Sequence, residues 1–208
     1  MTESIGLFYF SGTGNTQVVA ELLAKAFEQH GAQVEIVRIE HVLQGRARFE
    51  PEAYDLVGIG HPIHCFDAPR IVYDFVDILP RAEKKRTFIF KTAGDFISVN
   101  NAGSKTAIKQ LECKGYDVFY DRIICMPTNW TMKYSDEFSK QLCYVATAKT
   151  EHMAGEVLAG QERKLRINAL LRWITKLTSR GEDLGARFFG MFLSIENKAI
   201  CWPKTRPL

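Results

Sequence analysis

The segment Ser11-Gly12-Thr13-Gly14-Asn15-Thr16 constrains the fold of this chain most strongly. An apolar run, residues 5–10, precedes it, and an apolar-periodic segment, residues 18–27, follows it. This order predicts a strand, a tight loop and a helix. Two glycines let the backbone turn so that several N–H groups point into one small volume, and hydroxyl and amide side chains add donors. Because the loop opens a helix, it also gains free N–H groups and a partial positive charge, so we predict an anion site suited to a phosphate.

The kind of phosphate can be narrowed from the same residues. The nucleoside-triphosphate loop requires a Lys that reaches the terminal phosphates, and no Lys or Arg lies between Ser11 and Ala24. The dinucleotide fingerprint requires a small residue where Gln17 stands, although Glu40 is available as its acidic residue, so this alternative stays open. A neutral pocket rich in hydroxyls fits a single terminal monophosphate. A plain turn with a helix cap is the other alternative, and the position directly after the first strand disfavours it.

The rest of the chain alternates strand and helix patterns. Strands are predicted at residues 5–10, 34–39, 54–60, 87–91 and 118–125, and helices at 15–30, 70–79 and 102–113, with a long helical region beginning near Ser135. Five strands alternating with helices predict a parallel sheet with right-handed crossovers. Ligands bind such a sheet where the strand order reverses, at the carboxyl ends of the strands. The loops 11–16, 60–69 and 92–101 are therefore expected to meet at one mouth.

Residues 8–16 (F-Y-F-S-G-T-G-N-T) resemble the phosphate loop of flavodoxins, which hold the 5′-phosphate of FMN. Together with the other two loops, the resemblance covers roughly the first 150 residues, a usual size for one domain. It implies a flavodoxin-like α/β fold: a five-stranded parallel sheet of order 2-1-3-4-5, helices on both faces and a C-terminal helical extension. It also implies FMN as the cofactor.

A second pattern narrows the resemblance. The motif Gly60-His61-Pro62-Ile63-His64, followed by Ala68-Pro69-Arg70, is similar to the flavodoxin domain of EFR1-family proteins, which join that domain to a ferredoxin-like module with two iron–sulfur clusters. The loops at residues 92–94 and 126–129 also look like those of this group. The resemblance implies FMN binding and electron transfer. It does not imply the clusters, because their cysteine-rich segment is missing.

The candidate cofactor-binding residues lie in the three loops. A planar flavin ring needs a flat aromatic wall, which Phe66 can supply, and the 92–95 loop can offer backbone N–H groups to the polar edge of the ring. We assign no catalytic acid or base, although His64 is a reasonable proton donor near a flavin. A metal site built from His61, His64 and Cys65 lacks a fourth ligand, so no metal is expected. The predicted cofactor-binding residues are Ser11, Gly12, Thr13, Gly14, Asn15, Thr16, Pro62, Ile63, His64, Cys65, Phe66, Thr92, Ala93, Gly94 and Asp95.

Composition and charge argue against several classes of protein. No signal peptide or apolar stretch of about 18 residues is present, so we expect no transmembrane segment. Five scattered cysteines without C-x-x-C spacing favour reduced thiols and a cytoplasmic location. Residues 151–208 hold ten Lys or Arg and six Asp or Glu, and the first 150 residues have a net charge of −1. Free-standing flavodoxins are typically strongly acidic, so this chain does not fit a carrier that docks by negative charge. No nucleic-acid partner is expected.

The sequence predicts two parts, a flavodoxin-like FMN-binding domain at residues 1–160 and a basic amphipathic helical extension at 161–208. In the extension, apolar residues recur at helical spacing from Leu165 to Leu177, with Arg and Lys between them. We expect the apolar stripe to pack on the sheet domain or on a second copy in a homodimer. A surface for a membrane or a partner protein is the alternative.

These observations predict an FMN-dependent electron-transfer protein or oxidoreductase. Its partner is expected to be a redox protein, a ferredoxin-type protein among others, or a small acceptor. Because the same fold hosts other flavin enzymes, an FMN-dependent reductase or oxidase of a quinone or of protoporphyrinogen is the first alternative. The second alternative, from another class, is a non-catalytic flavin-binding module that serves assembly.

Overall fold

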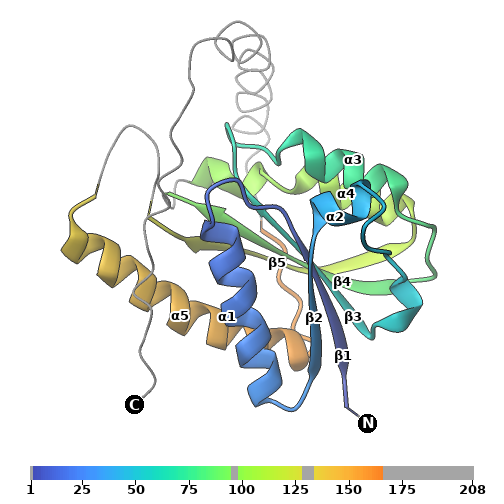
Figure 1. Ribbon diagram of the computed structural model, residues 1–208, viewed down its shortest axis with the longest axis horizontal. Coiled ribbons are helices and arrows are strands. Elements are labelled where there is room, and N and C mark those ends of the chain that lie inside the picture. The colour runs from blue at the N-terminus through green and yellow to red at the C-terminus, as the bar shows by residue number, and fades with distance from the viewer. Residues whose placement is uncertain (1, 95–97, 128–133, 166–208) are drawn as a thin grey trace, which may run out of the picture.

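The computed structural model describes residues 2–94, 98–127 and 134–165 (Figure 1). It contains one five-stranded sheet in which every adjacent pair of strands is parallel. The strands are β1 (Ser4–Tyr9), β2 (Gln33–Arg38), β3 (Leu56–Pro62), β4 (Lys85–Ala93) and β5 (Tyr116–Cys125). Their order, β2-β1-β3-β4-β5, confirms the predicted topology.

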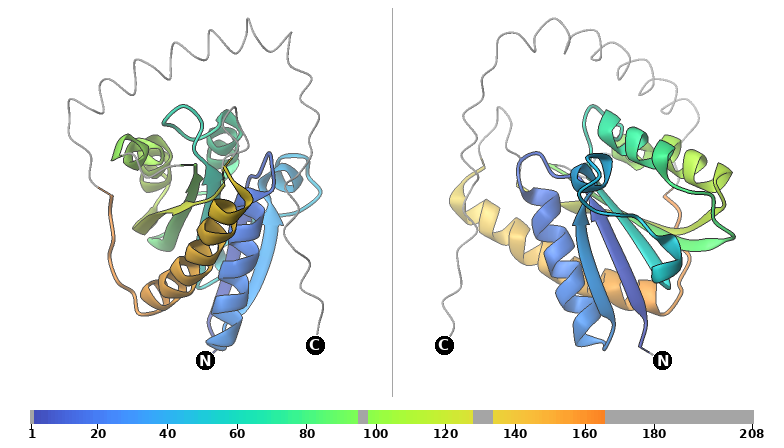
Figure 2. Two further views of the ribbon diagram at one scale, coloured as in Figure 1. Left: turned by 90° about the vertical axis from the view of Figure 1, so that its left-hand side faces the viewer. Right: turned by 45° about the vertical axis from the view of Figure 1, so that its right-hand side comes forward.

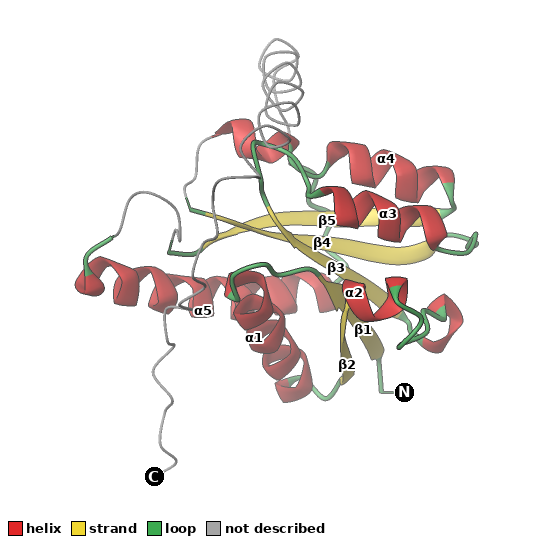
Figure 3. Ribbon diagram, turned by 45° about the horizontal axis from the view of Figure 1, so that its top comes forward, coloured by secondary structure: helices red, strands yellow, loops and turns green. Residues whose placement is uncertain are grey.

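Helices cover both faces of the sheet. They are α1 (Asn15–Gln29), α2 (Ile39–Leu43), α3 (Arg70–Ile78), α4 (Lys105–Cys113) and α5 (Asp136–Leu158), with short 3-10 turns at Pro51–Ala53 and Ser98–Ala102. Helices α1 and α5 lie together on one face, and α2, α3 and α4 lie on the other (Figures 2 and 3). The carboxyl ends of the strands therefore lie between two helical layers.

Two apolar cores separate these layers from the sheet. Successive strand residues point to opposite faces, so Leu7 joins the core under α1 and α5 while Phe8 joins the core under α2 and α3. The same alternation places Phe88 in the first core and Ile89 in the second. All four side chains have no exposed surface, and burial of each contributes about 1.5–3 kcal/mol. This explains why the strands read as nearly continuous apolar runs.

The glycines of β3 make room for the aromatic side chains of β4. A Cβ atom at Gly58 would lie 2.5 Å from the ring of Phe88 and 2.6 Å from the side chain of Leu7. At Gly60 a Cβ atom would overlap the ring of Phe90. The glycine-rich end of β3 is thus a packing requirement of the sheet, directly below the loop that carries His64 and Phe66.

Helix α5 begins where the sequence predicts, with Ser135 as its N-cap and the Ser135 side chain accepting a hydrogen bond from the Phe138 backbone N–H. Its second half packs in the core through Met153 and Val157, whereas Tyr144 in its first half is 79% exposed. Beyond the helix, the Arg163 backbone pairs with the outer edge of β5. The predicted extension otherwise lies at residues 166–208, outside the described residues.

Two local predictions need correction. Asn100 and Asn101 do not cap α4, because residues 98–102 wind into a 3-10 turn and the N-cap position falls at Ser104. The second strand ends at Arg38, and the next residues form the short helix α2, which the sequence pattern did not indicate. None of the helices in the described ranges is long and apolar enough to cross a membrane.

Candidate functional site

The three predicted loops meet at the carboxyl ends of β1, β3 and β4 (Figure 3). The Phe10 N–H donates to the Gly60 carbonyl at 2.9 Å, which joins the ends of β1 and β3. The Ile63 N–H donates to the Thr92 carbonyl at 2.8 Å, which joins the loops after β3 and β4. These contacts confirm that the segments converge on one mouth.

The loop after β1 has the tight turn that its glycines predict. Gly14 has a φ of 96°, in the left-handed region that favours glycine, and its N–H donates to Ser11 Oγ at 3.1 Å. Gly12 and Thr13 are exposed, and no atom lies within 4 Å of a Cβ built on Gly12 or Gly14. The loop therefore borders open space at the start of α1.

The N-terminus of α1 offers hydrogen-bond donors without a competing acceptor. No side chain caps it, and its first turn contains no Asp or Glu. The first helical hydrogen bond runs from the Val18 N–H to the Gly14 carbonyl. Among the described residues, the N–H groups of Asn15, Thr16 and Gln17 have no acceptor. This donor set, with the positive end of the helix dipole, fits the terminal phosphate of a cofactor.

The polar side chains of the loop divide into two groups. Ser11, Asn15 and Thr16 contact the protein itself: Asn15 Nδ2 donates to the Pro127 carbonyl at 2.7 Å, and the hydroxyls of Thr16 and Thr92 are 2.8 Å apart. These contacts tie α1 to β4 and to the segment after β5. Thr13 is the exposed hydroxyl of the loop. It is therefore the side chain best placed to reach a ligand.

Arg38 adds a positive charge that the sequence interpretation missed. It stands at the end of β2, opposite Tyr9 in the sheet register, and its guanidinium donates to the Ser11 carbonyl at 3.2 Å. It also pairs with Glu40 at 2.6 Å, and this hydrogen bond raises the pKa of Arg38. Arg38 lies outside the loop in the sequence, at the end of the next strand along the chain. Arg38 becomes visible once the strand order places β2 beside β1.

The loop after β3 contains a closed two-residue turn. The N–H groups of His64 and Asp67 each donate to the carbonyl of the other at 2.9 Å, and the residues between them, Cys65 and Phe66, have φ values of 52° and 66°. Left-handed backbone costs a residue with a side chain roughly 1–2 kcal/mol. Such strain concentrates at functional sites, where the surrounding structure holds it in place.

Asp67 anchors this turn to helix α3. Its Oδ1 accepts hydrogen bonds from the Ala68 N–H at 2.9 Å and from the Tyr73 hydroxyl at 2.5 Å. Burial and the hydrogen bond to Asp67 raise the pKa of Tyr73, so this phenol remains a donor. Within the turn His64 is exposed and Phe66 is partly buried. The sequence interpretation did not assign a role to Asp67 or Tyr73.

His61 belongs to β3 and is completely buried. Its Nδ1 lies 3.0 Å from the Pro62 carbonyl, which can only accept, so Nδ1 carries the proton. Burial, with a smaller contribution from the charge of Lys91, lowers the pKa of His61 to about 3. His61 is therefore neutral. Its Nε2 is a buried acceptor without a partner among the described residues.

The loop after β4 is bound to the C-terminal half of the domain. Thr92 is buried, the Ala93 carbonyl accepts from the Met126 N–H at 2.9 Å, and the Gly94 carbonyl accepts from the Tyr134 hydroxyl at 2.9 Å. Asp95 lies outside the described residues. Tyr134, which precedes α5, is a further residue of this mouth that the sequence interpretation missed.

The described residues contain no group of three His, Cys, Asp or Glu side chains that could hold a metal ion. The cysteines within the described ranges, Cys65, Cys113, Cys125 and Cys143, are all free thiols.

Comparison with known proteins places this geometry in a family. A family model described as "Flavodoxin domain" matches residues 6–117. No protein of curated function matches the sequence significantly. Among solved structures, oxidised flavodoxin 1 from Bacillus cereus is similar, with a TM-score of 0.53 and 17% identity over 75% of this chain and 97% of that chain. Streptococcus pneumonia TIGR4 flavodoxin is also similar, with a TM-score of 0.51 and 14% identity over 76% of this chain and 99% of that chain.

At 17% and 14% identity, the two solved structures show only that this chain shares their fold. The assignment to a family rests on the family model. The matched residues span more than half of the chain and include the loops 11–16, 61–66 and 92–95. The uncapped N-terminus of α1 and the glycine turn before it provide the donors that the family's phosphate loop requires. The chain belongs to the flavodoxin domain family, and FMN is the cofactor that this membership implies.

Proposed function

We propose that this chain is an FMN-binding electron-transfer protein whose cofactor phosphate is held by residues 11–16. The uncapped N-terminus of α1 is the observation that supports this most strongly, because three backbone N–H groups have no acceptor among the described residues and the first turn contains no carboxylate. When bound, FMN supplies the uptake and release of electrons. The protein sets the position of the flavin and its access to partners.

The side chains around this helix start would complete the phosphate site. The exposed Thr13 hydroxyl would donate a further hydrogen bond, and Arg38 brings a positive charge to the Ser11 carbonyl. The buried pair Thr16 and Thr92 would keep the loop after β4 fixed relative to the phosphate. Binding would then use a site that is already organised, which limits its entropic cost.

The flavin ring would lie against the loops after β3 and β4. The closed turn would hold the ring of Phe66 as a wall, and Pro62, Ile63, His64 and Cys65 would form the rest of that side. Backbone groups of Thr92, Ala93 and Gly94, with Asp95, would meet the polar edge of the ring. Neutral His61 adds no charge beneath the turn.

The identity of the electron partner is a further part of this proposal. A redox protein, or a small acceptor such as a quinone, would approach the mouth, and the basic C-terminal residues would attract an acidic partner. The motif at residues 60–70 supports placement in the EFR1 subgroup. The four cysteines of the described ranges form no disulfide, which supports a reducing compartment, the cytoplasm.

The experiment begins with mass identification of the chromophore released from the purified protein. Stoichiometric FMN that dithionite reduces, and that a quinone such as menadione or a ferredoxin then reoxidises, would support the proposal. FMN that exchanges no electrons with either acceptor would favour the assembly module instead. Released FAD, or no uptake when the protein is titrated with FMN, would refute flavin binding by this phosphate loop.

A further inference from the structure

A polar cavity lies at the outer edge of β5, apart from the flavin mouth. It has a volume of about 200 Å³. Three of the side chains in its wall are cationic, and none of the described residues that line it is an Asp or Glu. Asn101, in the 3-10 turn Ser98–Ala102, contributes a side-chain amide to this wall. The lining residues are Asn101, Arg122, Ile123, Lys149, Arg163 and Leu165.

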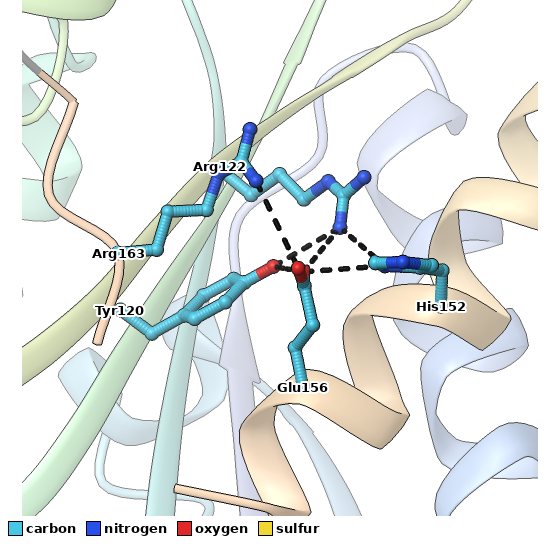
Figure 4. Close-up of polar contacts among 5 residues, drawn as sticks. All are labelled: Tyr120, Arg122, His152, Glu156 and Arg163. Atoms are coloured by element: carbon cyan, nitrogen blue, oxygen red, sulfur yellow. Dashed lines mark hydrogen bonds and ion pairs between the residues drawn. The ribbon is translucent and has the colours of Figure 1, made fainter. Parts of the chain in front are cut away.

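Arg122 is held in a fixed orientation by the carboxylate of Glu156 (Figure 4). Its Nη1 donates to Glu156 Oε2 at 2.6 Å and to the Tyr120 hydroxyl at 3.1 Å, and it lies 3.2 Å from His152 Nδ1. The Tyr120 hydroxyl donates to the same carboxylate, and the Arg122 side chain is only 13% exposed. Within the described ranges, Nη2 and Nε of Arg122 have no partner. A rigid guanidinium therefore keeps donors available at the cavity wall.

Arg163 and Lys149 bring two more positive charges to the same place. Arg163 Nη1 is 3.9 Å from Glu156 Oε1, too far for a hydrogen bond, and the Arg163 side chain is 45% exposed. Its backbone is fixed to β5, because the Arg163 N–H donates to the Phe119 carbonyl at 2.9 Å and its carbonyl accepts from the Asp121 N–H at 2.7 Å. Burial lowers the pKa of Lys149, and the charges of Arg122 and Arg163 lower it further. The cations are thus close enough to repel one another.

The backbone of β5 contributes a donor to the same wall. The Asp121 N–H points outward from the sheet, to the Arg163 carbonyl. Because strand residues two apart point the same way, the Ile123 N–H lies on the same edge, and Ile123 lines the cavity. The wall therefore combines cationic side chains, a side-chain amide and a strand edge.

We propose that this cavity binds the phosphate group of a small phosphorylated molecule, at a site distinct from the FMN phosphate loop. The positive charges of Arg122, Arg163 and Lys149 attract a phosphate monoester, whose charge is close to −2 at neutral pH. Arginine forks bind phosphate oxygens in a bidentate way, and the guanidinium of Arg122 lines the cavity and is held in place by Glu156. The volume accommodates a phosphate with a small attached group. The site rests on β5 and α5, so it does not depend on the proposed function.

Titration calorimetry of the purified protein with inorganic phosphate at low salt tests this proposal. The variant Lys149→Gln/Arg163→Gln removes two cations and keeps Arg122, so that Glu156 stays paired. We expect this variant to bind phosphate at least about tenfold more weakly than the wild type, because the loss of one charge-assisted hydrogen bond lowers affinity by about that factor. The control Lys25→Gln/Lys109→Gln makes the same charge change at exposed positions away from the cavity and should bind within about twofold of the wild type.

A rescue variant separates binding from structure. Lys149→Arg/Arg163→Lys keeps both charges and should retain most of the affinity. Because residues 11–16 are unchanged in every variant, the same ranking is expected with and without bound flavin. A wild-type protein without saturable phosphate binding, an equal loss in the control variant, or citrate binding as tightly as phosphate would each overturn the assignment.

Discussion

The buried ion pair between β4 and β5 gives the sharpest test of the fold. Lys91 Nζ lies 3.0 Å from Asp121 Oδ2 and 2.7 Å from Ser104 Oγ, and the Ser104 hydroxyl donates to the same Asp121 oxygen at 2.6 Å. The side chains of Lys91 and Asp121 are 0% and 3% exposed. Replacing Lys91 by Met would leave the Asp121 carboxylate buried without its cation, and its Oδ1 already has no partner among the described residues.

Breaking a buried pair on one side typically costs about 3–5 kcal/mol, whereas replacing both partners by apolar groups is often nearly neutral. We therefore expect Lys91→Met to remove about 3–5 kcal/mol from the free energy of unfolding, a large part of the roughly 5–15 kcal/mol typical of a domain. The double variant Lys91→Met/Asp121→Leu should be more stable than Lys91→Met alone. The two substitutions are thus expected to be strongly non-additive.

Urea unfolding followed by circular dichroism at pH 7 measures these differences. The control Asp74→Asn breaks the exposed Arg70–Asp74 pair on α3, which should cost at most about 0.5 kcal/mol. A loss below about 1 kcal/mol for Lys91→Met, or additive effects in the double variant, would refute the reasoning.

The remaining predictions concern pH, the strained turn and the packing of β3. Because the pKa of His61 is lowered from 6.5 to about 3, the unfolded state binds a proton that the folded state does not bind between these pH values. The free energy of unfolding should therefore fall by about 1.4 kcal/mol for each unit by which the pH is lowered from 6.5 toward 3, and His61→Asn should remove this component of the pH profile. Cys65→Asn should raise the free energy of unfolding by about 0.5–1 kcal/mol, since Asn tolerates left-handed backbone better than Cys. A lower free energy of unfolding in this variant would contradict the inference that the backbone at Cys65 is strained. In urea titrations Gly58→Ala should cost about 1–3 kcal/mol, whereas Gly155→Ala on α5, where a Cβ meets no atom within 4 Å, should stabilise the protein slightly.

Much of the fold follows from local sequence because its signals are local. The apolar runs that became β1, β3 and β4 are buried on both faces, so their pattern is unambiguous. The turn at Gly14 and the cap at Ser135 are set by the chemistry of single residues. The convergence of the three loops then follows from the strand order.

The missed features depend on contacts between distant segments. Arg38 reaches Ser11 because β2 lies beside β1, and Thr16 meets Thr92 across 76 residues of chain. Lys91 ends an apolar run, and only the fold reveals that Asp121 and Ser104 surround it. The prediction that Asn100 and Asn101 cap α4 was wrong because Asn and Ser are both favoured at the N-cap position. The 3-10 turn at Ser98–Ala102 takes up the Asn residues and leaves Ser104 at the N-cap.

The central claim is that residues 11–16 hold the phosphate of FMN. Fluorescence titration of the flavin-free protein with FMN and with riboflavin, which lacks the phosphate, tests it most directly. Because two or more charge-assisted hydrogen bonds depend on the phosphate, FMN should bind at least about a hundredfold more tightly than riboflavin. Thr13→Ala should reduce this ratio about tenfold through weaker FMN binding alone, and the control Thr2→Ala, an exposed threonine before β1, should leave it unchanged. Equal affinities for FMN and riboflavin in the wild-type protein would contradict the account.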